Sequence, residues 1–180
     1  MQFELRVFFL EESMHWSMAE GTPLGTLWVI ASTRGVRRVL FGENGEREWA
    51  KVQRAYPEME RREDSLAAQA LAQILEYLRG GRKTFTVPLD PEGTPFQRRV
   101  WAETARIPYG QTVTYRELAR RIGQPGAARA VGQALGANPL PILIPCHRVI
   151  AADGRLGGYT GGRYLKEWLL RLEGAQLAAE

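Results

Sequence analysis

The chain has 180 residues, which is enough for one ordinary domain or two small ones with a buried core. Hydrophobic residues make up 44% of it and no apolar run is long enough to cross a bilayer, so we expect a soluble globular protein with no membrane partner. The single cysteine, Cys146, excludes an internal disulfide. With only His15 and His147 beside it, we expect no structural zinc site.

The formal net charge of +4 is unevenly distributed along the chain. Residues 1–89 contain 12 basic and 12 acidic side chains, whereas residues 90–180 contain 12 and 8. The whole basic excess therefore falls in the second half. A basic second half is compatible with a polyanionic partner, although an excess of this size supports the idea only weakly by itself.

The beginning of the chain predicts β-strands. Phe3, Leu5 and Val7 alternate with polar residues, which is the period of a half-buried strand. Residues 24–31 and 36–41 are two further strand-like runs, and the Ser-Thr-Arg-Gly segment between them is typical of a hairpin connection.

Two helices are expected next, a polar one near residues 43–55 and an amphipathic one near residues 65–79. Two consecutive glycines at 80 and 81 should end the second helix. The segment 84–93 contains two prolines and a glycine, so we place a domain boundary there. The apolar face of the second helix carries Leu66, Ala70, Ile74 and Leu78.

The second half of the chain predicts short helices. The sequence Thr-Pro-Phe-Gln at 94–97 has the pattern of a capping box with proline in the first turn, so a helix should run to about residue 105. The segment Ile-Pro-Tyr-Gly at 107–110 should stop the chain from continuing as a helix. The inward face of this helix should carry Phe96, Val100 and Trp101.

A second capping box, Thr-x-x-Glu at 114–117, opens a helix that should end before Gly123, and a further helical run spans residues 127–136. Two short helices joined by a Gly/Pro turn match a helix-turn-helix unit. The second helix, with Arg129 and several small residues, would then be the recognition helix. An ordinary helical hairpin matches the same pattern, and the pattern alone favours it.

The segment 138–150, Asn-Pro-Leu-Pro-Ile-Leu-Ile-Pro-Cys-His-Arg-Val-Ile, is the most informative stretch. Its apolar run is clamped by prolines, so it should be rigid and buried and should hold Cys146 in place. Only a thiolate attacks well, and a free thiol of pKa ~8.5 is mostly protonated at neutral pH, so a reactive cysteine needs a base. In an extended chain His147 would point to the opposite face, so either the backbone turns sharply here or a water relays the proton. A buried, unreactive cysteine is the alternative.

The sequence Pro-Cys-His-Arg-Val at 145–149 resembles the active-site signature of the O6-alkylguanine-DNA alkyltransferases, also called methylated-DNA–protein-cysteine methyltransferases. The resemblance covers essentially all of residues 93–174 without an insertion, whereas residues 1–89 contain no motif that matches residue by residue. The other matching blocks follow the family's order and spacing: Gly93-Thr94-Pro95-Phe96-Gln97, Tyr115, Ala128-Arg129-Ala130-Val131-Gly132, Asn138-Pro139, Gly157, Tyr159, Gly161-Gly162 and Lys166-Glu167-Trp168-Leu169-Leu170.

The resemblance implies a chemical role for five residues. Cys146 resembles the alkyl acceptor, and His147 resembles a general base that acts through a water, with Glu173 orienting its far nitrogen. Asn138 resembles the residue that fixes the local backbone and the geometry of the site. Tyr115 resembles a residue with two tasks, because it crowds the target phosphate to promote base rotation and then donates its hydroxyl hydrogen to the departing guanine.

The resemblance also implies a DNA-binding surface and a substrate pocket. Arg129 resembles a finger that enters the duplex and fills the gap left by the extruded base. The glycine-rich loop at 157–162 lacks the Lys-Ser/Thr of a P-loop, so we reject a nucleotide site. Gly158 and Thr160 replace a larger polar residue and a serine that are common in the family, so loop mobility and tolerance of bulky alkyl groups should differ. The expected DNA contacts are Thr114, Tyr115, Ala128, Arg129, Ala130 and Gly132. The expected pocket lining is Leu135, Val149, Tyr159 and Thr160.

The expected fold is an α/β N-terminal support domain at 1–89, with a small sheet and helices, followed by a mostly α domain at 90–180 that contains the helix-turn-helix. The resemblance implies stoichiometric transfer of an alkyl group from O6 of guanine in duplex DNA to Cys146, by a monomer, without a cofactor or metal. The main alternative is a non-catalytic helix-turn-helix protein that binds lesions. A cysteine hydrolase is disfavoured because nothing suggests an oxyanion hole. The first ten residues carry acid early and lack a small-residue cleavage site, so we expect no signal peptide and a cytoplasmic protein, or a nuclear one in a eukaryote.

Overall fold

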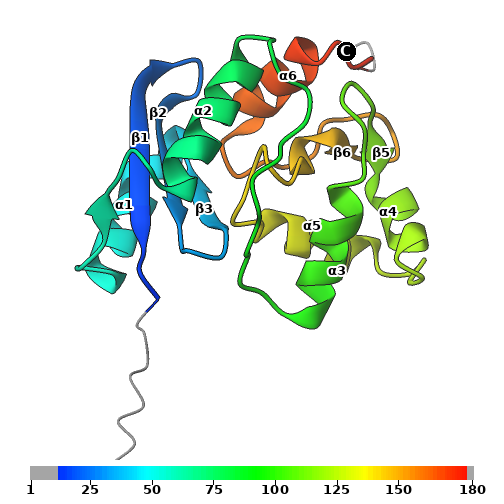
Figure 1. Cartoon of the computed structure of the whole chain (residues 1–180). Helices are drawn as coiled ribbons and strands as arrows, with labels where there is room; N and C mark the ends of the chain where they lie inside the picture. The colour runs from blue at the N-terminus through cyan, green and yellow to red at the C-terminus, as the bar shows by residue number, and fades with distance from the viewer. Residues whose placement is uncertain (1–11, 178–180) are drawn as a thin grey trace, which may run out of the picture.

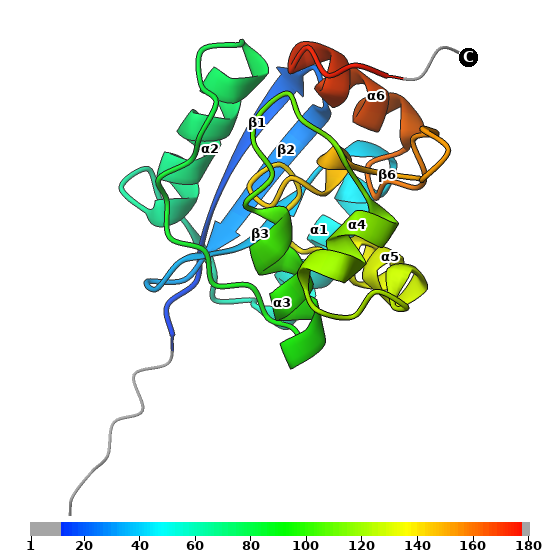
Figure 2. The ribbon, with the colours of Figure 1, turned by 90° about the vertical axis from the view of Figure 1, so that its right-hand side faces the viewer.

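A computed structural model of the chain describes residues 12–177. A sheet with its helices forms one side of the molecule and a group of short helices forms the other (Figures 1 and 2). The predicted fold class, an α/β N-terminal part followed by a mostly helical C-terminal part, is confirmed. The strand predicted around Phe3, Leu5 and Val7 lies outside the described residues.

The strands of the N-terminal sheet are β1 (His15–Thr22), β2 (Gly25–Ala31), β3 (Val36–Leu40) and β4 (Glu60–Arg61). Their order is β3-β2-β1-β4, in which β1 pairs antiparallel with β2, β2 pairs antiparallel with β3, and the short β4 pairs parallel with β1. The two strand-like runs correspond to β2 and β3, and the predicted hairpin between them is closed by a hydrogen bond from the Ser32 nitrogen to the Gly35 oxygen (3.0 Å). The sequence pattern did not predict β1.

Two helices pack against this sheet, α1 (Gly45–Ala55) and α2 (Leu66–Leu78), and both agree with the sequence-based prediction. Leu27 and Val29 of β2 belong to the large core together with the apolar face of α2. Trp28 and Ile30 of the same strand belong to a smaller core together with Val52 of α1. Successive side chains of a strand point to opposite faces. Residues 27–31 of β2 are all apolar and buried because helices cover both faces of the strand there.

The helices of the C-terminal half are α3 (Pro95–Thr104), α4 (Tyr115–Arg121), α5 (Ala128–Gly136) and α6 (Arg163–Leu172). Two-residue strands β5 (Val113–Thr114) and β6 (Val149–Ile150) pair in parallel, and two 3-10 turns are η1 (Gly42–Asn44) and η2 (Cys146–Arg148). The capping box predicted for α3 is confirmed, because Thr94 accepts a hydrogen bond from the Gln97 nitrogen and the Gln97 side chain accepts one from the Thr94 nitrogen. Within residues 12–177, no helix has the length and apolar content needed to span a bilayer.

The capping box predicted for α4 forms only in half. Thr114 accepts a hydrogen bond from the Glu117 nitrogen, as expected. The Glu117 carboxylate, however, pairs with Arg120 (2.8 Å) and Arg121 (3.1 Å) instead of reaching back to the Thr114 nitrogen. Two charged donors on the next turn hold the carboxylate, because hydrogen bonds between ionised groups are stronger than those to a neutral amide.

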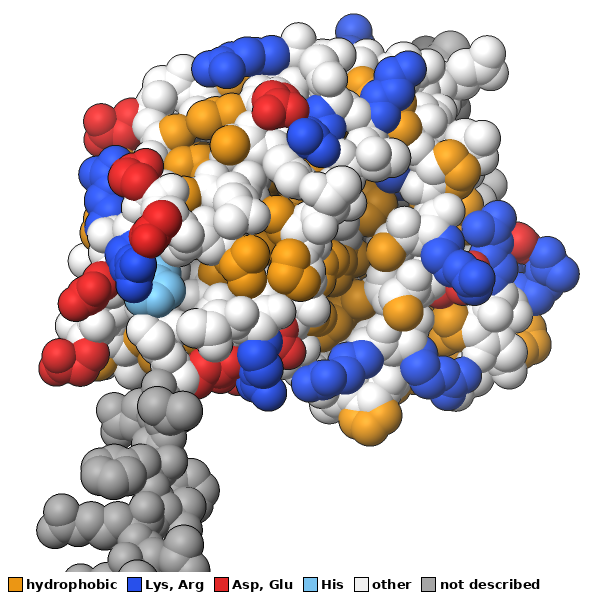
Figure 3. Space-filling model, viewed as in Figure 1, with side chains coloured by type: hydrophobic (Ala, Val, Ile, Leu, Met, Phe, Trp, Pro, Cys, Tyr) orange, Lys and Arg blue, Asp and Glu red, His pale blue; other side chains and the backbone are white. Residues whose placement is uncertain are grey.

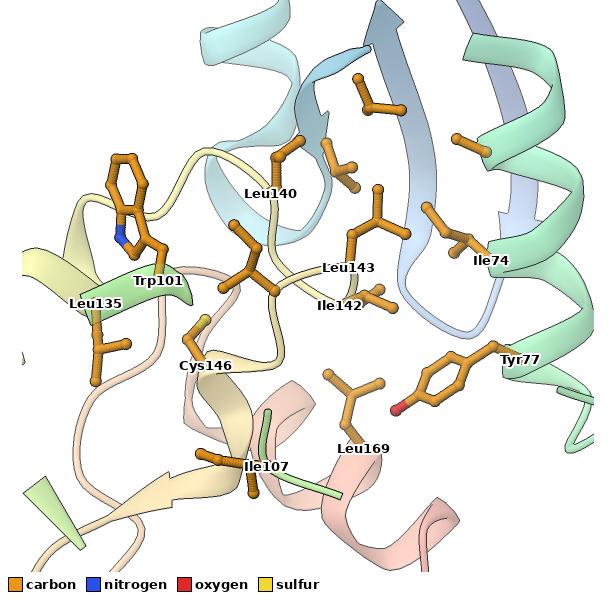
Figure 4. Close-up of a cluster of buried hydrophobic side chains, with 14 of the residues drawn as sticks. Ile74, Tyr77, Trp101, Ile107, Leu135, Leu140, Ile142, Leu143, Cys146 and Leu169 are labelled. Atoms are coloured by element: carbon orange, nitrogen blue, oxygen red, sulfur yellow. The ribbon is translucent and has the colours of Figure 1, made fainter. Parts of the chain in front are cut away.

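The large hydrophobic core runs across the predicted domain boundary without a break. Figure 4 shows Ile74 and Tyr77 of α2 facing Leu143 and Leu169, which belong to the C-terminal half. Deeper in that half, Trp101 is buried and donates from Nε1 to the Ala134 oxygen of α5 (2.8 Å). Phe96, which was predicted to face inward, is only partly buried and packs against the same core. The segment that carries Cys146 is therefore positioned by both halves of the chain.

Candidate active site

The turn that precedes Cys146 is held from within by Asn138. The Asn138 side-chain oxygen accepts a hydrogen bond from the Leu140 nitrogen (2.9 Å), and its side-chain nitrogen donates to the Ile144 oxygen (2.9 Å). The Ile144 nitrogen donates to the Leu140 oxygen (2.8 Å), which closes the turn. Inside it, Ile142 has a φ of 75°, a conformation that costs a β-branched residue ~1–3 kcal/mol. The Asn138 side chain thus holds a strained turn directly before the cysteine.

Cys146 is the first residue of η2, so the backbone turns sharply after it rather than continuing extended. Its side chain is buried, with 6% exposed. Burial raises the pKa of the thiol, and the nearby Asn138 amide and Lys166 ammonium oppose this only in part. The thiol is therefore neutral at rest and needs a base at the moment of reaction.

His147 is fully buried, and its Nε2 lies 2.8 Å from Oε1 of Glu173. An ionised carboxylate only accepts hydrogen bonds, so Nε2 carries the hydrogen and Nδ1 has the free lone pair. Within residues 12–177, the buried Nδ1 has no hydrogen-bond partner. Burial lowers the pKa of His147, and the hydrogen bond to Glu173 opposes this without cancelling it. The ring is therefore neutral at pH 7 and can accept a proton at Nδ1.

Glu173 is held by four donors besides the neighbouring imidazole. Arg148 donates from Nε to Oε2 (2.9 Å) and from Nη2 to Oε1 (2.8 Å), a bidentate pair. The Gly110 nitrogen donates to Oε2 (3.2 Å), and the Tyr77 hydroxyl donates to Oε1 (2.6 Å). Burial opposes ionisation of Glu173, but hydrogen bonds from His147, Arg148 and Tyr77 outweigh it and hold the pKa of the carboxyl far below its ordinary range. The sequence pointed to Glu173 but gave neither Arg148 nor Tyr77 a role.

Cys146 lies in the wall of a pocket of about 640 Å³. Three of the four residues expected to line the pocket do so. Val149 does not, because β6 turns its side chain into the core, where it is fully buried. Asn44 is a lining residue from the N-terminal half that no sequence signal marked. Within the part of the chain that the structure describes, no group of His, Cys, Asp or Glu side chains is placed to hold a metal ion. The lining residues are Asn44, Tyr115, Gly132, Leu135, Gly136, Cys146, Gly157, Gly158, Tyr159 and Thr160.

Tyr115 packs between two glycines at this pocket. A Cβ added at Gly157 would lie 2.7 Å from the Tyr115 hydroxyl oxygen, and one added at Gly132 would lie 3.8 Å from its ring. Gly157 also has a φ of 71°, so both its backbone and its neighbour require glycine. Burial, followed by the proximity of Cys146, raises the pKa of Tyr115. The phenol therefore keeps its proton at neutral pH and is able to donate it.

Lys166 is a buried cation for which the sequence predicted no role. Its side chain is 0% exposed, and Nζ donates to the Val149 oxygen (2.6 Å) and to the Gly158 oxygen (3.2 Å). Burial lowers the pKa of Lys166 to about 8. Its two hydrogen bonds join the glycine-rich loop to β6, the strand that directly follows the η2 turn with Cys146.

The residues expected to contact DNA lie on α4 and α5 or at their ends. Arg129 of α5 is exposed, and it has no ion pair or hydrogen bond to any residue between 12 and 177. Ala128 and Ala130 flank it and are partly exposed, and Thr114 caps α4. Figure 3 shows Lys and Arg side chains gathered over α4, where Arg116 and Arg120 are exposed. α4 thus presents positive charge to solvent, and α5 presents Arg129 between small side chains that allow a close approach.

For a thiol to attack a group carried by a nucleobase, that base must reach the sulfur, and the pocket beside α5 provides the room. The fold therefore places a buried thiol, a neighbouring imidazole and a large pocket beside a pair of short helices, which is the arrangement of a cysteine that accepts a group from a bound substrate. Residues 14–91 match the family model described as 6-O-methylguanine DNA methyltransferase, ribonuclease-like domain. Residues 95–175 match the model of the DNA binding domain of the same family. The chain belongs to the 6-O-methylguanine DNA methyltransferase family.

Similar proteins cover nearly the whole chain. The constitutive methylated-DNA–protein-cysteine methyltransferase of Bacillus subtilis (strain 168) is 39% identical over 161 residues, which is 89% of this chain and 96% of that protein. The methylated-DNA–protein-cysteine methyltransferase of Shigella flexneri is 44% identical over 157 residues, which is 85% of this chain and 92% of that protein. The crystal structure of Mycobacterium tuberculosis OGT in complex with DNA has a TM-score of 0.77 at 39% identity and covers 89% of this chain and 92% of its own.

Proposed function

We propose that this protein repairs DNA by moving an alkyl group from O6 of guanine in the duplex to the sulfur of Cys146. The observation that carries the proposal is the position of a buried thiol in the wall of a pocket of about 640 Å³. An apolar cavity of about 150 Å³ is enough to bind benzene, so this pocket has room for a guanine with its alkyl group. Membership of the family supports the same reaction.

The transfer begins with the proton of the thiol. It passes to the free Nδ1 of His147 through a bridging water, and Glu173 stabilises the imidazolium that forms. The thiolate then attacks the alkyl carbon, so that a carbon–sulfur bond forms while the carbon–O6 bond breaks and its electron pair leaves with guanine. Tyr115 donates its hydroxyl hydrogen to the departing base, after which the phenolate takes up a proton and the imidazolium releases one, so both return to their neutral forms. The product is a thioether, whose removal would require a second displacement at an unactivated carbon, so each molecule acts once.

The target atom lies inside the base stack, so the nucleotide must rotate out of the duplex at a cost of a few kcal/mol. We propose that α4 and α5 act as a helix-turn-helix and that Arg129 fills the gap left by the base. The partly exposed Ala128 and Ala130 let the α5 backbone approach the DNA, and the cations of α4 contact phosphates without reading the sequence. In this proposal residues 90–180 bind DNA and carry out the transfer, residues 1–89 support them, and the protein works as a monomer in the cytoplasm or nucleus, where genomic DNA is found.

The experiment that tests the function is a single incubation of the protein with a duplex that contains one O6-methylguanine. We expect the peptide that bears Cys146 to gain the mass of one methyl group and an equal amount of guanine to be restored. The Cys146→Ala variant should transfer nothing while it still binds DNA, because phosphate contacts do not involve the thiol. Several turnovers per molecule would contradict the single-use mechanism. Binding of the lesion without any transfer by the unaltered protein would favour a non-catalytic lesion-binding protein.

A further inference from the structure

A tyrosine of the N-terminal half lies inside the proton relay. Tyr77 is in α2 and is fully buried. Its hydroxyl donates to Oε1 of Glu173 at 2.6 Å, and this is the same oxygen that lies 2.8 Å from Nε2 of His147. The Tyr77 hydroxyl is also only 3.4 Å from Nε2 itself. Phenol, carboxylate and imidazole therefore meet at one point.

The positions of the hydrogens in this cluster follow from which groups can donate and which can only accept. Glu173 is ionised and accepts only, so both the Tyr77 hydroxyl and Nε2 of His147 must donate to it. Burial and the neighbouring Glu173 raise the pKa of Tyr77, so the phenol keeps its hydrogen at neutral pH. Tyr77 and His147 thus share one carboxylate oxygen as donors, and each limits how strongly that oxygen holds the other.

The ring of Tyr77 cannot easily move away from this contact. Its centroid lies 5.5 Å from that of Phe85 and 6.0 Å from that of Tyr109, the second in an edge-on arrangement. Figure 4 shows Tyr77 reaching from α2 towards Leu169 of α6, and Glu173 is the residue that follows the last turn of this helix. The hydroxyl is therefore fixed by packing against residues of both halves of the chain.

We propose that Tyr77 is a positioning residue of the transfer reaction, because its hydroxyl holds part of the charge of Glu173 and so sets how readily His147 takes up a proton. This rests on the proposed function, in which His147 is the base. It also gives the N-terminal half a part in the chemistry, although the sequence predicted only support for it.

The sign of the effect follows from the groups around the imidazole. Removing the Tyr77 hydroxyl takes one hydrogen-bond donor away from the Glu173 carboxylate and leaves the other groups around His147 unchanged. The negative charge of Glu173 then interacts more strongly with His147. The imidazolium is then favoured, so the pKa of His147 should rise. The groups that face His147 are Glu173 and Lys166 from α6, Arg148 and Cys146 from η2, Tyr77 from α2 and Tyr159 from the glycine-rich loop.

The test compares Tyr77→Phe with Tyr109→Phe. Both variants remove one phenolic hydroxyl from neighbouring rings, but among residues 12–177 the Tyr109 hydroxyl donates to the Leu172 backbone oxygen (3.3 Å) and not to Glu173. The single-turnover transfer rate is measured as a function of pH with free O6-benzylguanine, so that DNA binding does not affect the rate. The pKa of His147 is measured by NMR in the same proteins, where only two histidines give signals. For Tyr77→Phe we expect the acid limb of the rate and the His147 titration to move up by roughly half a pH unit. Tyr109→Phe should leave both in place.

Two results would overturn the inference: unchanged profiles in Tyr77→Phe, or equal shifts in the two variants, which would indicate a general effect of packing. If Tyr77→Phe does not fold, 3-fluorotyrosine incorporated at position 77 keeps the ring and donates more strongly. It should then move the acid limb and the titration to lower pH, and no shift would again overturn the inference. The NMR titration needs no activity, so failure of the unaltered protein to transfer an alkyl group would count against the proposed function and not against the role of Tyr77.

Discussion

Replacing Asn138 by alanine should destabilise the protein far more than the loss of an ordinary side-chain amide. Asn138, Leu140 and Ile144 are 5%, 0% and 3% exposed, so the backbone nitrogen and oxygen that Asn138 serves are both buried. A buried backbone group left without a partner costs ~1–3 kcal/mol. Asn138→Ala leaves two such groups, and water enters the space of the lost side chain in part, so the free energy of unfolding should fall by about 3 kcal/mol. For a protein of this size the melting temperature should fall by roughly 6–12 °C.

The matched control is Gln73→Ala. Gln73 is half-buried and also uses both ends of its amide, donating to the Thr86 hydroxyl (2.7 Å) and accepting from the Thr86 nitrogen (3.0 Å), but these two bonds are exposed to solvent. Its loss should cost less than about 1 kcal/mol, because water replaces both partners. Urea unfolding of the two variants gives the comparison directly. Equal losses would refute the idea that Asn138 holds the turn before Cys146, and a transfer rate unaffected by Asn138→Ala would show that the turn does not present the thiol.

Three further outcomes are expected. Arg129→Ala should slow repair of an O6-methylguanine duplex at least tenfold while reaction with free O6-benzylguanine stays within about twofold, since only the duplex needs base rotation; equal losses in the two single-turnover assays would argue against that role. Gly157→Ala should slow transfer several-fold and cost about 1 kcal/mol in a melting experiment, because the new Cβ meets the Tyr115 hydroxyl and the φ is positive; an unchanged rate would mean that the tyrosine moves aside freely. The free energy of unfolding should decline as pH falls from 7 to about 4. In the folded protein the pKa of buried His147 is lowered from 6.5 and that of Glu173 is lowered from 4.5, so the unfolded state binds more protons through this range. Urea titrations that give a constant free energy between pH 7 and 5 would contradict this.

The sequence predicted features of the fold whose signal lies within a few residues. The hairpin closed by Ser32 and Gly35 and the capping box at Thr94 each depend on residues three positions apart, and both are confirmed. The strand β1 escaped prediction because its faces do not divide into polar and apolar. Ser17 is a buried polar residue, whereas Trp16 on the opposite face is only partly buried. Alternation is a reliable signal only where one face of a strand meets solvent.

Part of the site could not be found from the sequence, because its contacts join residues that are far apart along the chain. Tyr77 follows Ile74 by three positions, so the amphipathic pattern marks it only as a core residue of α2. Its hydroxyl meets a carboxylate 96 residues away, and no local signal shows this. The same holds for Arg148, whose side chain spans from Glu173 to the Ile107 oxygen (2.6 Å).

The N-terminal half contributes to the site although it contains none of the sequence motifs. Every site residue that the sequence indicated lies within 90–180, yet the relay ends on Tyr77 and the pocket wall includes Asn44. The ring centroid of Phe41 lies 6.3 Å from that of Tyr159, and a Cβ added at Gly42 would lie 2.8 Å from the backbone oxygen of the glycine at 161. The loop over the pocket therefore packs against the residues that directly follow β3. A reactive cysteine that is neutral at rest depends on the exact placement of its base and its pocket. In this chain both are completed by Tyr77 of α2 and Asn44 of η1, so the N-terminal half helps to hold the geometry around the thiol.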